Sequence, residues 1–160
     1  MYMFLTSLTN LQKMYGVVGD LEKAVLIVDF DPSTRRTFRR ILEKNGYNAN
    51  EAANGEEARK KMKNHCYDAV LISLQIPDMD GIDLLLFAKQ SLPNAAKIIH
   101  TGILSLESTI RAIEAGADGL FAKPVSPETL ILAIRETLQD KETVLSTFSG
   151  EKKPCSLPYP

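Results

Sequence analysis

Four polar residues stand at the ends of short apolar runs, and their side chains could bind an ion or pair with one another. Asp29 carries a carboxylate, Ser73 and Thr101 carry hydroxyls, and Lys123 carries an ammonium group. The hydroxyls and the ammonium could donate hydrogen bonds to a phosphate or a carboxylate. Because Mg²⁺ prefers an octahedral shell of oxygens with carboxylates among them, a single aspartate is a weak metal site.

These four residues can meet only if the apolar runs are neighbouring strands of one sheet. Between Lys23 and Asp140, short apolar runs alternate with amphipathic stretches, which is typical of βα units around a parallel sheet. The predicted strands are residues 24–28, 47–52, 68–73, 97–101 and 119–122. Ligands of such sheets bind beyond the carboxyl ends of the strands, where all four polar residues would lie.

The remaining pattern predicts the fold class. Asp31 before Pro32, and Ser126 before Pro127, place a capping side chain ahead of a proline at the first helical position. Three strands are near-continuous Val, Ile and Leu runs, as strands buried on both faces should be, whereas the polar 47–52 predicts an edge strand. The order βαβαβαβαβα, with right-handed crossovers, predicts an α/β fold with a doubly wound, five-stranded parallel sheet of the flavodoxin-like (βα)5 type.

Several motifs along residues 23–140 occur in the order and spacing of one known family. They are AVLIVDFDP at the first strand, YDAVLISLQIPDMDG around the third, AKIIHTG at the fourth and AGADGLFAKP around the fifth. This part of the chain resembles the CheY-like receiver domain of two-component response regulators. The resemblance implies a cytoplasmic signalling module that accepts a phosphoryl group from a histidine kinase onto an aspartate.

Matched to that family residue by residue, the chain lacks three functional side chains. The family ends its first strand with two adjacent acids, the second of which binds Mg²⁺, and here the pair is Asp29 and Phe30. Ser73 stands at the position of the phosphoacceptor aspartate, and Leu120 at the position of the aromatic switch residue. The resemblance therefore implies an atypical receiver with a degenerate phosphorylation pocket.

Two functional side chains of the family are kept. Thr101 matches the hydroxyl that hydrogen-bonds the phosphoryl group, and Lys123 matches the lysine that pairs with it, next to Pro124 in a peptide bond that the resemblance implies to be cis. We expect Asp29 and Lys123 to form an ion pair, with Ser73 hydrogen-bonded between them. Magnesium binding should be weak or lost, and neither a metal site nor another cofactor is predicted.

Other polar residues near the strand ends are predicted to be structural. Asp31 is expected to cap the helix that follows it, and Asp78 and Asp80 to shape the loop after the third strand and cap the third helix. His100 is expected to be packed, hydrogen-bonded and turned away from the side that Thr101 uses. The arginines at 35, 36, 39 and 40 predict a solvated face.

The main hypothesis is a non-enzymatic receiver module that acts through protein–protein interaction without phosphorylation, since a serine hydroxyl is a weak nucleophile without an adjacent base. Its partners would be signalling proteins, such as a histidine kinase, another regulator or a target. Residues 104–115 and 126–138 are the candidate surface, because the fourth helix, fifth strand and fifth helix bind partners or form dimers in the family. The alternatives are a small-ligand or anion sensor that uses the altered pocket, and a phosphoacceptor that uses another acid.

Composition excludes several other classes. Lys and Arg number 19 against 20 Asp and Glu, so the net charge of -1 gives no reason to expect nucleic-acid or membrane-surface binding. No apolar run approaches the roughly 20 residues of a membrane-spanning helix, and no signal peptide is evident, which predicts a cytoplasmic protein. Cys66 and Cys155 lack CxxC or Cys/His spacing and are predicted to be two reduced thiols.

Two segments lie outside the alternating pattern. In residues 1–22, apolar residues are spaced three and four apart, which predicts a short amphipathic helix packed on its own domain or on a dimer mate. Residues 141–160 carry three prolines in their last seven positions and little apolar periodicity. That segment is predicted to be a mostly disordered tail after a receiver domain at 23–140.

Overall fold

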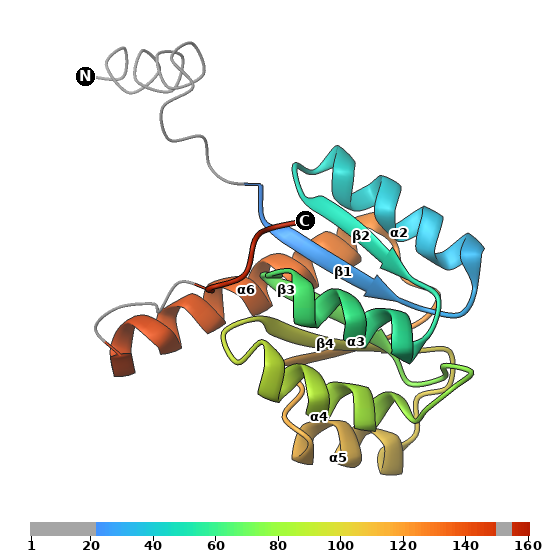
Figure 1. The fold of residues 1–160 in the computed structure, drawn as a ribbon. Coiled ribbons are helices and arrows are strands. Elements are labelled where there is room, and N and C mark those ends of the chain that lie inside the picture. Colours follow the sequence, from blue (N-terminus) through green and yellow to red (C-terminus); the bar gives the residue numbers. More distant parts are fainter. Residues whose placement is uncertain (1–21, 150–154) are drawn as a thin grey trace.

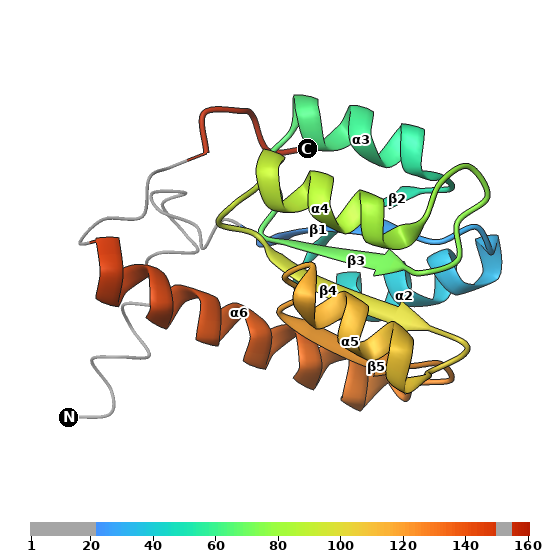
Figure 2. The same ribbon diagram turned by 90° about the horizontal axis from the view of Figure 1, so that it is seen from below.

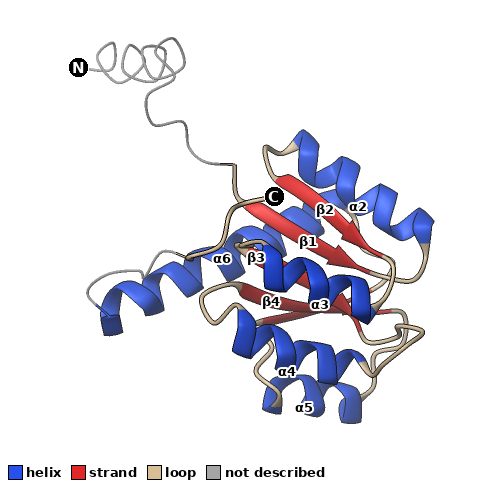
Figure 3. Ribbon diagram, viewed as in Figure 1, coloured by secondary structure: helices blue, strands red, loops and turns tan. Residues whose placement is uncertain are grey.

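The computed structural model describes residues 22–149 and 155–160. Strands and helices alternate along the first of these ranges (Figures 1 and 3). The strands are β1 (Ala24–Val28), β2 (Asn48–Ala52), β3 (Ala69–Ser73), β4 (Ala96–Thr101) and β5 (Gly119–Ala122). The helices are α2 (Pro32–Lys44), α3 (Gly55–Asn64), α4 (Gly81–Ser91), α5 (Leu106–Glu114) and α6 (Pro127–Ser149). Every predicted strand is present, with its ends shifted by at most one residue.

The strands form one parallel sheet with the order β2-β1-β3-β4-β5. The chain moves outwards from β1 to β2, then crosses back over β1 and continues outwards through β3, β4 and β5. This is the doubly wound, five-stranded α/β sheet that the sequence predicts. The polar strand β2 pairs only with β1 among the described strands, which confirms it as an edge strand.

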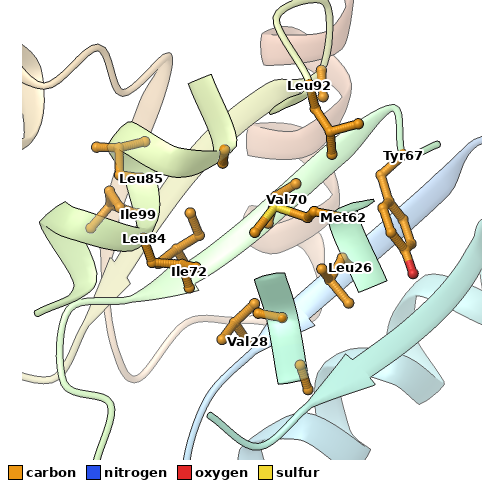
Figure 4. Close-up of a cluster of buried hydrophobic side chains, with 14 of the residues drawn as sticks. Leu26, Val28, Met62, Tyr67, Val70, Ile72, Leu84, Leu85, Leu92 and Ile99 are labelled. Atoms are coloured by element: carbon orange, nitrogen blue, oxygen red, sulfur yellow. The ribbon is translucent and has the colours of Figure 1, made fainter. Parts of the chain in front are cut away.

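Helices cover both faces of the sheet (Figure 2). Side chains alternate along each central strand, so that Leu26 and Val28 of β1 pack toward α3, α4 and α5, and Ile27 packs toward α2 and α6. Figure 4 shows the first of these clusters, in which Met62 of α3 lies over Leu26 and Val70. Both clusters are buried, which explains the continuous apolar composition of the central strands.

Helix caps lie where the sequence places them. Asp31 accepts hydrogen bonds from the backbone N–H groups of Ser33 and Thr34, with Pro32 at the first helical position of α2. Asp80 caps α4 by accepting from the N–H of Ile82. These side chains satisfy donors that have no partner inside the helix, and they fix where each helix starts relative to the preceding strand.

The predicted ends of the chain need correction. Helix α6 continues through Ser149, past the predicted domain end at Asp140, and residues 155–160 lie against the domain. Cys66 and Cys155 form a disulfide rather than two free thiols. Neither the composition of residues 141–160 nor the spacing of the two cysteines predicts this bond, because cysteines that are distant in sequence leave no pattern that indicates their pairing. The helix predicted in residues 1–22 lies outside the described residues. None of the described helices combines the length and hydropathy needed to cross a bilayer.

Candidate functional site

The four polar residues singled out in the sequence converge at the carboxyl end of the sheet. Asp29 follows β1, Ser73 and Thr101 end β3 and β4, and Lys123 follows β5. Parallel strands in register bring these positions together, as in the pairing of Ser73 with His100 across β3 and β4. We call the residues Asp29, Phe30, Ser73, Thr101 and Lys123 the candidate pocket.

The centre of the candidate pocket is a buried ion pair. Asp29 is fully buried, and its Oδ2 lies 2.7 Å from Lys123 Nζ. The other carboxylate oxygen, Oδ1, accepts a 2.8 Å hydrogen bond from the backbone N–H of Asp31. The ion pair expected from the sequence is therefore present. Both oxygens of the carboxylate are engaged by the protein itself.

The two hydroxyls of the candidate pocket bond to their own loops. Ser73 Oγ donates to the carbonyl of Gln75 at 3.1 Å and accepts from the N–H of Gln75 at 3.3 Å. Thr101 Oγ1 makes the same pair of bonds to Ile103, at 3.0 and 3.2 Å. The prediction that Ser73 bridges Asp29 and Lys123 is wrong, because a serine side chain is short and the backbone two residues ahead is within its reach.

The residues of the candidate pocket do not fit Mg²⁺. Phe30, at the position of the second acid, offers no oxygen and is 54% exposed. Asp29 already pairs with Lys123, and an ammonium group beside the carboxylate competes with a cation for it. In residues 22–149 and 155–160, no cluster of three or more His, Cys, Asp or Glu side chains could hold a metal ion.

His100 is a buried neighbour of the candidate pocket that the sequence interpretation placed only in part. Its ring stacks on Phe121 and meets Phe38 edge-on, so the expected packing is present. The expected hydrogen bonds are absent, since neither ring nitrogen has a partner with hydrogen-bond geometry. The nearest charged group is Asp29, whose Oδ2 lies 3.5 Å from Nδ1 of the ring. Burial lowers the pKa of His100 to about 4, against the opposing effect of Asp29, so the ring is neutral at pH 7. The contact between His100 and Asp29 cannot be predicted without the order of the strands, because β3 lies between β1 and β4 in the sheet.

The acids of the loop after β3 hold helices in place, as expected, but the contact of Asp78 with the start of α3 was not predicted. Asp78 accepts hydrogen bonds from the N–H groups of Gly55 and Glu56 at 2.8 and 2.9 Å, and these bonds lower its pKa. The side chain thereby ties this loop to the start of α3. Asp80 caps α4 and forms a 2.7 Å ion pair with Arg111 of α5.

Backbone contacts also shape this end of the sheet. Gly81 lets α4 begin against the end of β3, because a Cβ there would lie 2.5 Å from the carbonyl oxygen of Ser73. Arg35 is not part of a solvated face as predicted. Its guanidinium donates to the carbonyls of Asp29 and Phe30 and pairs with Glu51 at 3.2 Å. The sequence spacing of the arginines gives no signal for this contact.

The structure also describes the cis peptide bond and the switch position that the resemblance implies. The peptide bond between Lys123 and Pro124 is cis. Leu120 in β5 is half-buried and packs against the cluster under α3, α4 and α5. An aliphatic side chain fixed in this way has no ring to rotate between inward and outward positions.

Comparison with known proteins agrees with this fold. The family model described as the response regulator receiver domain matches residues 25–135. The chemotaxis protein CheY of Bacillus subtilis is 38% identical over 116 residues, which cover 71% of this chain and 96% of that protein. A solved CheY-like receiver domain from Methanospirillum hungatei JF-1 superposes with a TM-score of 0.74 at 36% identity, covering 77% of this chain and 98% of the other. The matched residues run from β1 into α6 and therefore span the whole sheet. The chain belongs to the response regulator receiver domain family of two-component signalling.

Some relatives are much longer than this chain. A cyclic di-GMP phosphodiesterase of Thermotoga maritima is 34% identical over 117 residues, which cover 73% of this chain and 31% of that protein. The chain spans between about a third and a half of the length of the first four curated relatives. The shared part is the receiver domain, so the activity of the longer proteins does not follow for this chain.

Proposed function

We propose that this chain is an atypical receiver that signals through protein–protein interaction without accepting a phosphoryl group. It would act in the cytoplasm, without enzymatic activity, metal or cofactor, and its partners would be signalling proteins rather than nucleic acid or membrane. The observation that carries the proposal is the hydrogen bonding of Ser73, which stands where the family has its acceptor aspartate. Its hydroxyl is buried and bonded to the backbone of Gln75, and no described side chain accepts a hydrogen bond from it.

The rest of the candidate pocket supports the same proposal. Lys123 would bind a phosphoryl group in a typical receiver, and here it is neutralised by Asp29 at 2.7 Å. Thr101 is bonded to Ile103. The donors that an anion sensor would need are therefore occupied, and the acids Asp78 and Asp80 that a displaced acceptor would need are committed to helix starts.

A candidate binding surface lies on α5 and α6. Apolar side chains that are exposed in the isolated chain lie on α5 and the loop before it, and Leu132 of α6 is exposed as well. They are Ile103, Leu104, Leu106, Ile110 and Ile113. Leu106 is 78% exposed and Ile113 64%, which is costly for a free surface and typical of an interface. We propose that this surface binds a partner signalling protein or a second copy of the chain.

The decisive experiment compares the natural chain with the variant Phe30→Asp/Ser73→Asp, which restores both missing acids. Amide chemical shifts are recorded while Mg²⁺ and then beryllofluoride, a mimic of aspartyl phosphate, are added. The natural chain should show no change around Asp29, Thr101 and Lys123, whereas the double variant should show saturable changes. Phe30→Asp alone is the matched control, because it restores a ligand but no acceptor. Saturable shifts in the natural chain would contradict the proposal.

The binding surface is tested separately by Ile113→Glu and Leu132→Glu, which place charges on exposed positions of α5 and α6. Sedimentation measures self-association, and binding to the cognate histidine kinase measures partner docking. We expect at least one of these interactions to weaken about tenfold or more, since a charge at the centre of an apolar interface must be desolvated. Arg40→Glu, on the exposed face of α2, is the control. Unchanged interactions in both variants would remove this surface from the proposal.

A further inference from the structure

A second site lies at the opposite, amino end of the sheet. Cys66 stands between α3 and β3 and is 1% exposed, whereas Cys155 is exposed. Their Cα atoms are 6.0 Å apart and their sulfurs form a disulfide across 89 residues of sequence. The Cα separation lies within the usual range for a disulfide.

Residues 155–160 make further contacts at this end of the sheet. The backbone N–H of Cys66 donates to the carbonyl of Pro158 at 2.8 Å, and the side-chain amide of Asn48 donates to the carbonyl of Pro160 at 3.0 Å. In Figure 1 this segment crosses the amino end of β1. A cavity of about 240 Å³ separates it from the α4–β4 loop. Its walls are Tyr67, Leu92 and Pro93 on the domain side, and Cys155, Ser156 and Leu157 on the other.

We propose that Cys66 and Cys155 form a reversible thiol–disulfide exchange site that fastens residues 155–160 over the amino end of the sheet. The exposures of the two cysteine residues differ, and this sets their roles. An external thiolate can reach Cys155, while Cys66 is reached only from within the protein. In a reducing compartment a protein disulfide is usually transient, and this step rests on the cytoplasmic location proposed above.

The oxidant in this exchange is a small-molecule or protein disulfide of the glutathione type. The Cys155 thiolate attacks one sulfur of that disulfide, its S–S bond breaks, and one thiolate leaves. The Cys66 thiolate then attacks Cys155 in the mixed disulfide and releases the second thiol. The two cysteines lose two protons and two electrons, and the external disulfide becomes two thiols. A dithiol reductant reverses both steps, starting with attack at Cys155.

Reduction would leave only a few hydrogen bonds to hold residues 155–160. The segment would then detach and expose the backbone of Cys66 together with Tyr67, Leu92 and Pro93. Because this site lies at the end of the sheet away from Asp29 and Lys123, its response does not depend on whether the candidate pocket can be phosphorylated.

The test uses the full chain equilibrated with different ratios of reduced to oxidised glutathione. Thiols are trapped with a maleimide in denaturant and counted by intact mass, and hydrogen exchange of the folded chain is followed at the amide of Cys66 and in residues 155–160. We expect no maleimide addition under oxidising conditions and two additions under reducing ones. On reduction, exchange at the Cys66 amide should accelerate about tenfold or more.

Cys155→Ser is the matched variant, because it alters an exposed side chain and should leave the core intact. Its exchange rates should equal those of the reduced natural chain at every glutathione ratio. Ser156→Ala keeps both cysteines and should behave as the natural chain does. Two reactive thiols at every ratio would overturn the proposal. So would a disulfide that resists millimolar reduced glutathione in the folded chain, since the bond would then be a permanent crosslink. A failed phosphorylation test would not alter these readouts.

Discussion

The carboxyl and amino ends of the same sheet use their polar side chains in different ways. At the carboxyl end, the candidate pocket keeps the positions that serve phosphoryl chemistry in its family, but Asp29, Ser73 and Thr101 bond within the protein. At the amino end, Lys97 is buried with its ammonium group donating to the carbonyls of Leu92 and Pro93. There the disulfide joins a segment far away in sequence.

The comparison indicates that polar groups of the candidate pocket stabilise the fold whether or not they bind a ligand. Asp29 neutralises Lys123 and lies beside the fully buried ring of His100. A region that buries a charge must keep the groups that pair with it or accept its hydrogen bonds, whether or not it binds a ligand. Substitutions at the two ends should differ in how far they lower the free energy of unfolding and in whether that loss depends on pH or on reductant.

The largest effect is expected for Asp29→Ala at the carboxyl end. It leaves Lys123 without its counter-charge and the N–H of Asp31 without its acceptor, which should cost about 4 kcal/mol in the free energy of unfolding. Urea unfolding measures the loss. The second change Lys123→Met in the same chain should recover part of it, because no unpaired ammonium group remains. A loss below about 1 kcal/mol would show that Lys123 finds solvent instead.

A slightly smaller effect is expected for Cys155→Ser at the amino end. Removing a disulfide that closes 89 residues should lower stability by about 3 kcal/mol, because the unfolded chain gains conformational freedom. Unfolding is measured with and without a dithiol reductant. The loss should appear only without reductant, and the natural chain and the variant should be equally stable with it. A difference that persists in reductant would assign the effect to the native contacts of Cys155.

The next effect is a pH dependence from His100 at the carboxyl end. Its pKa is lowered from 6.5 to about 4 in the folded chain, so the unfolded chain binds more protons between these values. Stability from this group is therefore full above about pH 6.5 and is lost as the pH falls toward 4, by about 2 kcal/mol at pH 5. Urea unfolding above pH 6.5 and at pH 5 measures this difference in the free energy of unfolding. His100→Phe, which can still pack between Phe38 and Phe121, should lose this part of the dependence. An unchanged dependence in that variant would assign it to other groups.

The fold and the membership of the site were predictable from sequence because both depend on local patterns. Apolar runs gave the strands, Asp31 and Asp80 gave helix starts, and strand ends gave the residues that meet. The contact between His100 and Asp29 could not be predicted, since it joins strands that are not adjacent. The disulfide lacked any signal in spacing. The hydrogen bond of Ser73 was wrongly predicted because a distant partner was preferred to the nearby backbone.

The smallest effect is expected for Ser73→Ala, and it sharpens the comparison most directly. If the hydroxyl serves only its own loop, its loss should cost about 1 kcal/mol or less, because Gln75 is exposed and its backbone groups can bond to water instead. Thr101→Val, which removes the matching bonds to Ile103, should cost a similar amount. Urea unfolding gives both values, and binding to a partner should not change.

A loss of partner binding in Ser73→Ala with unchanged stability would contradict this prediction, because the hydroxyl would then act on another molecule. Small costs at Ser73 and Thr101 beside a large cost at Asp29 would separate the charges that the carboxyl end must keep from the hydroxyls that only order its loops.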